Sequence, residues 1–361
     1  MKSALKNKAL LTFKPDMEEA AQRWEAYWRG EMLDRPLVRV ECWREDFTPK
    51  RVVGYGYYEN VHEDIDTLLD NAFYNASGKY YGGESVPHFF ASFGADEIAA
   101  FCGGTLHWHE NSPGTNWSEP FVWDWEKSLP LKIDRQNALW RRMVLLAERA
   151  CERFKGSLLP FNVDYHSNMD ILLAARGAEN LCTDLFDVPE LIDRAMENAR
   201  EIFRDVWEET RRACQKDELG FWYDGFSHDS VCVLSCDFCC MVGREMFRRW
   251  VLPTLEFEAS FVDHALYHWD GPRALTHYED LMSIKKLHTL SFVPDPFEKH
   301  AQYVDLYKDI QARGKSVMVW GSADELRQLH RELDPAKTMY IAHVRTPAEA
   351  DELLAWFVKN T

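Results

Sequence analysis

His268 and Asp270 carry the first chemical signal of the chain, within the stretch DHALYHWDGP at residues 263–272. The apolar run before Gly271-Pro272 predicts a short strand, so the two side chains point the same way at its carboxyl end. An imidazole and a carboxylate in that place can bind a metal ion or share a proton. The alternative interpretation is a histidine that packs against a helix and an aspartate that forms a turn.

Further polar side chains follow two other predicted strands. Asp164 and His166 come just after LLPFNV, a continuous apolar run that is typical of a buried parallel strand. Asp224 ends the predicted strand GFWYD, and His228 lies in the polar loop that follows. Parallel α/β enzymes hold their active sites at the carboxyl ends of strands, so we expect these side chains around a substrate. Asp170 is expected to cap a helix instead.

Two weaker metal signals have simpler alternatives. His107 and His109 alternate along an extended segment and so share one face, but no third ligand lies within sequence reach. The cysteines of CDFCC, from 236 to 240, lack a second cysteine pair and run straight into a predicted helix. We therefore expect a polar surface face in the first case, and packing thiols beside a capping Asp237 in the second.

Aromatic residues are numerous, with 14 tryptophans in the chain. Several of them lie near predicted strand ends or loops, which favours an aromatic-walled pocket, although ordinary core and surface positions explain them as well. The candidates for substrate contact are Trp43, Trp108, Tyr165, Trp222, Trp269 and Trp320.

Composition and charge exclude several classes of protein. The formal net charge is −17 and no basic stripe with interleaved aromatics offsets it, which argues against nucleic acid or an anionic membrane as a partner. No apolar run is long enough to span a membrane, and the first residues lack the core of a signal peptide. The nine cysteines form no regular disulfide framework, so we expect reduced thiols and a cytoplasmic protein.

The order of predicted elements indicates an α/β fold. Predicted strands near 36, 90, 158, 220, 265, 289, 317 and 340 alternate with helices. Eight such strands predict a closed parallel (β/α)8 TIM barrel, which accommodates residues 1–361 as one domain. Residues 1–34 form a helical extension before the first strand. Residues 43–130 form an elaborated loop and cap region over the barrel mouth.

Several segments resemble the uroporphyrinogen decarboxylase superfamily, which includes cobalamin-dependent methyltransferases of the methanol, methylamine and chloromethane systems. They are RPLVRV, DILLAARGAENLCTDLFDVPELI, CDFCCMVGREMFRRWVLPTLE, YHWDGPRALTHYEDLMSI and YIAHVRTPAEADELL, and the likeness covers most of residues 155–358. It implies a distorted (β/α)8 barrel, an active-site cleft at the strand carboxyl ends and a homodimer.

The chain departs from the porphyrinogen decarboxylases after its first strand. Those enzymes carry an arginine-rich signature of the form RQAGR there, which holds the carboxylates of the substrate. The equivalent stretch here is VECWREDF, in which Arg44 is the only cation and acidic residues flank it. A polyanionic tetrapyrrole meets repulsion at such a site, so the resemblance does not imply haem biosynthesis.

The methyltransferase branch has a zinc site built from a His-x-Cys pair and a cysteine of the last strand. His268 matches the histidine, Asp270 stands in place of the first cysteine, and His343 is at or near the last-strand position. This set would hold zinc with an open fourth position and would activate a methoxyl or hydroxyl oxygen rather than a thiol. The chain lacks a D-x-H-x-x-G cobalamin-binding signature, so a corrinoid would arrive on a separate partner protein.

Three functions remain open on this basis. The first is a corrinoid-linked, metal-dependent methyltransferase acting on a small methylated compound, methoxylated compounds included. The second is a metal-free decarboxylase or lyase acting on a non-porphyrin acid, in which the aspartates stabilise a cationic intermediate and the histidines handle protons. The third is a binding protein without catalytic activity.

Overall fold

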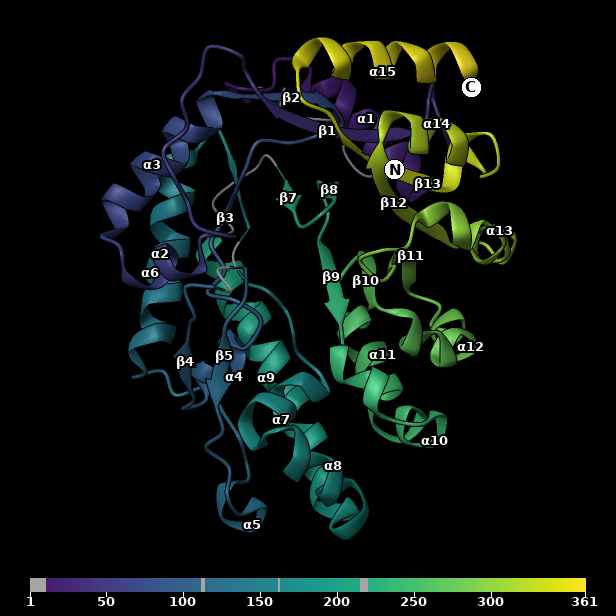
Figure 1. Ribbon diagram of the computed structural model, residues 1–361. Helices are drawn as coiled ribbons and strands as arrows, with labels where there is room; N and C mark the ends of the chain where they lie inside the picture. The colour runs from purple at the N-terminus through teal and green to yellow at the C-terminus, as the bar shows by residue number, and fades with distance from the viewer. Residues whose placement is uncertain (1–10, 112–113, 162, 215–219) are drawn as a thin grey trace, which may run out of the picture.

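A seven-stranded sheet organises the protein (Figure 1), whose computed structural model describes residues 11–111, 114–161, 163–214 and 220–361. The strand order is β2-β1-β13-β12-β11-β10-β9, and every neighbouring pair is parallel except β1 with β2. The strands are β1 (Leu37–Trp43), β2 (Lys79–Gly83), β9 (Val231–Ser235), β10 (His264–Asp270), β11 (Leu287–Val293), β12 (Ser316–Ser322) and β13 (Thr338–His343). The predicted α/β class is confirmed.

A separate parallel pair, β3 (His88–Phe90) with β6 (Leu159–Phe161), supplies the other two strands expected of a barrel. Among the described residues, no strand ladder joins β1 to β3 or β6 to β9. The arrangement is therefore similar to a TIM barrel, but its strands are not hydrogen-bonded into a closed ring.

The parallel strand predicted near residue 220 is wrong in position. That segment forms a short antiparallel hairpin, β7 (Phe221–Trp222) with β8 (Phe226–Ser227), and the parallel strand is β9. The chain reverses at Asp224 and Gly225, and Asp224 has a φ of 50°, in the left-handed region. This tight turn ends the strand, because a left-handed residue cannot continue an extended segment.

Helices surround the strands in Figure 1, and the expected cap region of residues 43–130 contains α2 to α5 and the small hairpin β4–β5. No described helix is both long and apolar enough to cross a lipid bilayer. The helices and the hairpin strands are α1 (Met17–Trp28), α2 (Tyr57–His62), α3 (Ile65–Ser77), α4 (Glu97–Phe101), β4 (Thr105–His107), β5 (Trp117–Glu119), α5 (Trp125–Ser128), α6 (Ala138–Phe154), α7 (Met169–Arg176), α8 (Ala178–Asp187), α9 (Pro189–Cys214), α10 (Arg244–Met246), α11 (Leu252–Ser260), α12 (Tyr278–Ser283), α13 (Val304–Ala312), α14 (Ala323–His330) and α15 (Pro347–Asn360).

Helix α1 lies against the amino ends of the parallel strands. Its Trp28 ring stacks on His264 at the start of β10, with ring centroids 4.5 Å apart, and meets the His288 ring near the start of β11. The Tyr27 hydroxyl lies 2.8 Å from the Thr289 hydroxyl. The predicted helical extension therefore covers this end of the strands with aromatic residues, which leaves the opposite, carboxyl end for a functional site.

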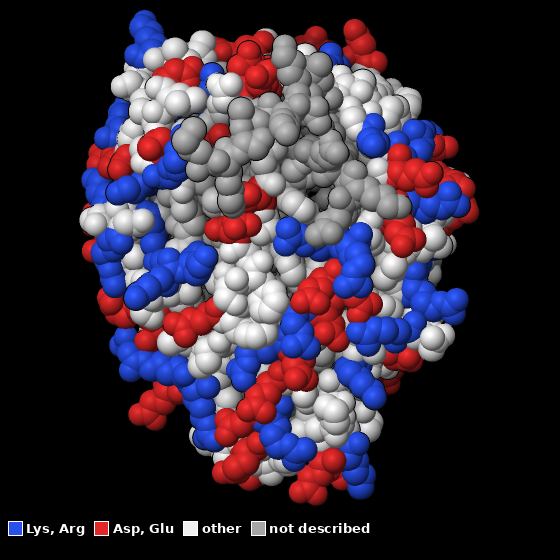
Figure 2. All heavy atoms as spheres, turned by 180° about the vertical axis from the view of Figure 1, so that it is seen from behind, with Lys and Arg blue, Asp and Glu red and all other residues white. Residues whose placement is uncertain are grey.

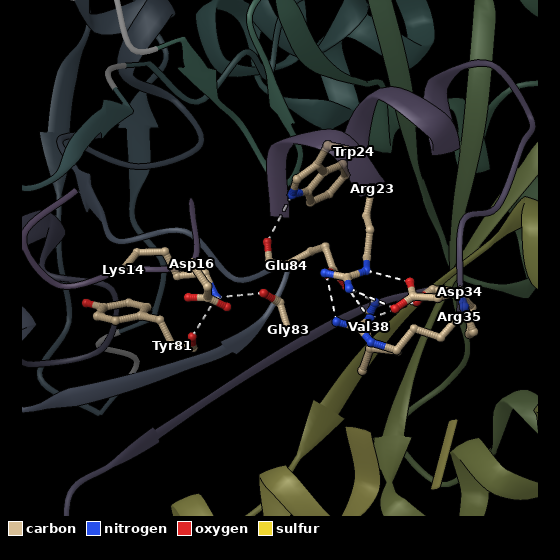
Figure 3. Close-up of polar contacts among 11 residues, drawn as sticks. Lys14, Asp16, Arg23, Trp24, Asp34, Arg35, Val38, Tyr81, Gly83 and Glu84 are labelled. Atoms are coloured by element: carbon tan, nitrogen blue, oxygen red, sulfur yellow. Dashed lines mark hydrogen bonds and ion pairs between the residues drawn. The ribbon is translucent and has the colours of Figure 1, made fainter. Parts of the chain in front are cut away.

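A buried ion-pair cluster holds the N-terminal segment on β1 and β2 (Figure 3). Glu84 binds Arg35 through both carboxylate oxygens, at 2.6 and 2.8 Å, and also accepts the backbone N–H of Val38. The Lys14 ammonium donates to Asp16 and to the carbonyls of Tyr81 and Gly83. We call these residues, together with Arg23 and Asp34, the N-terminal cluster.

Candidate functional site

A cavity of about 340 Å³ opens among the carboxyl ends of β3, β6, β9 and β10 and the β7–β8 turn. Five residues that the sequence predicts for the site line it, namely Asp164, His166, Trp222, Asp224 and His268. The other lining residues are Tyr55, Tyr57, His88, Phe90, Tyr223, Val233 and Ser235. The structure therefore has a cavity at the strand carboxyl ends, where the sequence predicts the site.

His166 lies between two carboxylates. Its Nδ1 is 3.0 Å from Asp164 Oδ1 and its Nε2 is 3.4 Å from Asp237 Oδ2. Burial alone would lower the pKa of His166, but the charges of Asp164 and Asp237 raise it well above the usual value of 6.5. Burial likewise opposes ionisation of the two aspartates, and the His166 charge outweighs it and lowers the pKa of both. The three groups form an imidazolium with two carboxylates.

Asp164 is held by further contacts beyond His166. The Tyr223 hydroxyl donates to Asp164 Oδ1 at 3.3 Å, and the Asp164 backbone N–H donates to Glu97 Oε1 at 2.6 Å. Glu97 is fully buried, and burial together with the nearby Asp164 charge raises its pKa well above the usual range. Burial and the same Asp164 charge raise the pKa of the Tyr57 hydroxyl. Asp164 is therefore held through its side chain by Tyr223 and His166 and through its backbone by Glu97.

Asp224 is fixed by Arg39, a buried cation of β1. Arg39 Nη1 donates to the Asp224 backbone carbonyl at 2.7 Å, and Arg39 Nη2 lies 3.4 Å from Asp224 Oδ1. The guanidinium also lies over the Trp222 ring, 4.6 Å from its centroid, and the His88 ring stacks on Trp222 at 5.0 Å. Half of the Asp224 side chain remains exposed, so one carboxylate faces the cavity while its backbone is anchored.

Three aromatic rings that line the cavity pack against one another. The ring centroids of Tyr55 and Tyr57 are 5.6 Å apart, and Phe90 lies 5.8 Å from Tyr57 and 6.4 Å from Tyr55. Such separations are typical of contacting aromatic pairs. We call these three residues the aromatic cluster.

Most of the predicted aromatic contacts lie elsewhere, which corrects the expected pocket wall. Trp269 is fully buried between Tyr278 and Phe292 because its strand packs both faces against other elements. The other residues outside the cavity are Tyr165, whose hydroxyl bonds Thr210; Trp108, against Tyr58 and His62; Trp43, stacked on Phe47; and His228, against Phe226. Trp222 alone of the six predicted aromatic residues lines the cavity.

The expected metal ligands do not come together in the described parts of the chain. His268 lines the cavity, whereas His343, at the end of β13, lines a second one of about 380 Å³ that also includes Trp320 and His300. Asp270 lies at the end of β10, where burial and the charge of Asp237 raise its pKa. In the ranges that the structure describes, no three His, Cys, Asp or Glu side chains are grouped so as to hold one metal ion. Zinc therefore remains an expectation of the resemblance.

The two weaker metal signals have local partners instead. His107 Nε2 lies 3.3 Å from Glu119 and its ring stacks on Trp117, while His109 Nδ1 accepts the backbone N–H of Asn111. The thiol of Cys236 is buried, and burial raises its pKa well above the usual value. The predicted polar face at His107 and His109 and the predicted packing thiol at Cys236 agree with these contacts, whereas the predicted cap at Asp237 is wrong, because its side chain lies beside His166.

Several residues of the site were missed at the sequence level. Arg39 interrupts the apolar run PLVRVEC, and an arginine inside a buried strand signals a charged partner. Asp237 was assigned to a helix cap, whereas its side chain faces His166. Within the aromatic cluster, Tyr55 lies in the turn before α2, Tyr57 is the first residue of α2 and Phe90 belongs to β3, and no periodic pattern in the sequence connects these segments.

Comparison with known proteins identifies the fold but not a family. No family model matches the chain, and no curated protein matches its sequence. A solved structure described as a methyltransferase from Methanosarcina mazei is similar, with a TM-score of 0.61 over 94% of this chain and 98% of that chain. The sequence identity is 11%, so the likeness is one of fold.

Proposed function

We propose that this protein is a methyltransferase of the uroporphyrinogen decarboxylase superfamily that takes a methyl group from a small methylated compound, with a corrinoid on a separate protein as the acceptor. The main support is the cavity at the strand carboxyl ends, which is lined by charged side chains. The fold is also similar to that of a methyltransferase. The sequence resemblance and the missing cobalamin-binding signature support the corrinoid partner.

The chain's own residues would bind and orient the methyl donor. When bound, a corrinoid supplies a strong nucleophile in the form of Co(I). Asp164 and Asp224 offer fixed negative charge, and the aromatic cluster shields the donor from water. A methylated oxygen leaves with negative charge and needs a proton, whereas a methylated ammonium nitrogen leaves neutral. Both classes of donor therefore belong in a first test.

The lyase alternative needs a side chain that can hand a proton to a carbanion. His166 is the cationic histidine of the cavity, but its two nitrogens face Asp164 and Asp237 at 3.0 and 3.4 Å. The two carboxylates hold its charge, so we assign His166 the role of positioning Asp164 rather than that of a proton donor, which supports methyl transfer over decarboxylation.

The test is spectroscopic. The purified protein is mixed with free cobalamin reduced to Co(I) and with methylated compounds bearing oxygen or nitrogen, and the loss of the Co(I) absorption is followed. We expect a donor-dependent loss that Asp164→Asn abolishes and that Trp43→Ala, outside the cavity, preserves. Release of carbon dioxide from a carboxylic acid without cobalamin, and no Co(I) loss with any donor, would overturn the proposal.

A further inference from the structure

Asp170 connects the start of α7 to the turn that follows β9. The residue is buried, with 4% of its surface exposed. The backbone N–H of Asp237 donates to its Oδ2 at 2.8 Å, and the backbone N–H of Phe238 donates to its Oδ1 at 2.9 Å. One carboxylate therefore fixes the backbone of two successive residues that lie 67 and 68 positions further along the chain.

The sequence predicts that Asp170 caps a helix, but the helix is not its own. Helix α7 has its cap in Asn168, whose side chain accepts the N–H of Met169. Asp237 begins a short 3-10 helix (Asp237–Met241), and the residue before it, Cys236, gives that helix no side-chain cap. Because the first N–H groups of a helix have no partner inside it, Asp170 supplies the acceptors from a distant segment.

This contact determines where the carboxylate of Asp237 lies. Among the described residues, the polar partner of that carboxylate is His166, whose Nε2 is 3.4 Å from Asp237 Oδ2. The position of the Asp237 side chain therefore depends on its backbone, which Asp170 holds. The other ring nitrogen of His166 lies 3.0 Å from Asp164 Oδ1, and Asp164 lines the cavity. A chain of contacts thus runs from Asp170 through Asp237 and His166 to Asp164.

The charge of Asp170 is more than a helix cap needs. Burial and the like charge of Asp237 raise the pKa of Asp170 to about 7, and the His166 charge opposes this rise. An asparagine or a serine caps a helix without such a penalty. Burial also raises the pKa of the other titratable groups near Asp170, which keeps them neutral at pH 7; they are Glu258, Tyr267 and the three thiols of CDFCC. The charge of Asp170 therefore acts within the group formed with Asp237 and His166.

We propose that Asp170 is a positioning residue of the candidate site, which holds Asp237 beside His166 and, through His166, fixes the Asp164 carboxylate in the cavity. That this carboxylate orients a methyl donor rests on the proposed function. Asp170 is not among the described residues that line the cavity, so it acts through the other members of the chain of contacts.

The test measures the pKa of His166 by NMR in full-length protein labelled at histidine, with His166→Gln to assign the signal. In Asp237→Asn, His166 loses one of its two carboxylate partners, so its pKa should fall by about one unit or more. Asp170→Ala releases the backbone of Asp237, and we expect a fall of similar size. When both substitutions are combined, the second should add little, because Asp170 acts through Asp237.

Asn137→Ala is the matched control for the loss of a cap. The Asn137 side chain also accepts two backbone N–H groups, those of Leu139 and Trp140 at the start of α6. This variant should lower the melting temperature, as Asp170→Ala does, and leave the pKa of His166 unchanged. If Asp170→Ala does not fold, Asp170→Asn replaces it, because asparagine keeps one acceptor oxygen; it should give a smaller fall in the same direction.

Two outcomes would overturn the inference. An unchanged pKa of His166 in a folded Asp170 variant shows a cap that serves stability alone. Fully additive falls in the combined variant show that Asp170 acts on His166 directly and not through Asp237. The proposed function fails separately: if the wild type consumes no Co(I) with any methyl donor, methyl transfer is contradicted, while the measured coupling between Asp170 and His166 stands.

Discussion

The N-terminal cluster and the charged groups of the cavity are both largely buried, but they differ in how completely their polar atoms are hydrogen-bonded. In the N-terminal cluster, each oxygen of Glu84 accepts at least two hydrogen bonds, and the Lys14 ammonium uses its three donors (Figure 3). Its members also carry opposite charges in close contact. A cluster of this kind holds the chain in place and has no capacity left for a ligand.

The charged groups of the cavity are less complete. Arg39 Nε, His166 Nδ1 and Asp237 Oδ1 are buried, and none has a hydrogen bond of good geometry to a described residue. His166 Nδ1 is close to Asp164 but poorly aligned with it, so the contact is one of charge rather than a directed hydrogen bond. Because a buried polar atom without a partner costs free energy, such atoms mark places where the protein retains polarity for a ligand.

The surface face in Figure 2 adds little to this difference. On the face shown in Figure 2, Lys and Arg side chains are interspersed with Asp and Glu, and no broad patch of either sign stands out. Ion pairs on such a surface contribute little, because solvent screens them. The distinction between structural and functional charge is therefore to be tested in the interior.

The largest effect is expected from breaking the N-terminal cluster. Glu84→Ala leaves Arg35, which is 7% exposed, without its partner carboxylate. We expect the free energy of unfolding to fall by about 3–5 kcal/mol in chemical denaturation. Asp34→Ala is the matched control, since Asp34 pairs with Arg23 but is half exposed, and it should cost about 1 kcal/mol or less. Equal losses in the two variants would show that burial does not set the strength of these pairs.

The next largest effect is expected at His166, and on activity rather than stability. In His166→Gln, Asp164 and Asp237 lose the cation that lowers their pKa, so both carboxyls take up a proton at higher pH than in the wild type. We expect the rate of Co(I) consumption to fall about 100-fold at neutral pH through misplacement of the donor. The acid limb of its pH profile should also move to higher pH. A uniform loss at all pH values would contradict the ion-pair role.

The sequence predicts the fold correctly where an apolar pattern extends over several consecutive residues. Continuous apolar runs such as SVMVWG and MYIAHV give their strands correctly, as β12 and β13, because buried parallel strands need no partner information to be recognised. At Asp224 the sequence predicts the end of a parallel strand, whereas the structure has a tight turn. The positive φ of this non-glycine residue is held by Arg39, which binds its backbone carbonyl. That contact joins residues 185 positions apart, and no local pattern encodes it.

The predicted site residues lie in two different cavities. Asp164, His166 and His268 line one cavity because each lies after or near the end of a parallel strand, and these strand ends converge in this fold. His343 also ends a parallel strand, yet it lines the second cavity, because β11 and β12 lie between β10 and β13 in the sheet. Strand order around the barrel was thus the missing information for the proposed metal set.

A smaller effect is expected from Glu258, a fully buried carboxyl of α11 with no well-aligned hydrogen bond from a described residue. Burial raises its pKa from 4.5 to about 8. The folded protein thus binds a proton that the unfolded chain releases between these two values, so the stability of the wild type falls as the pH rises through this window. Relative to wild type, Glu258→Gln should gain about 2 kcal/mol between pH 5 and about pH 6.5 in urea denaturation. A constant difference across the window would show that Glu258 is ionised in the folded state.

The smallest effect is expected at Trp43, which lies outside both groups of charged residues. The sequence predicted it to contact the substrate. Its ring is 38% exposed, stacks on Phe47 at 5.7 Å and lies under the Lys79 ammonium. Trp43→Ala should lower the free energy of unfolding by about 1 kcal/mol or less, because an exposed stack and one surface cation contribute little. Co(I) consumption should stay unchanged. A large loss of it would place this end of β1 in the functional site and would remove the distinction between the cavity and its surroundings.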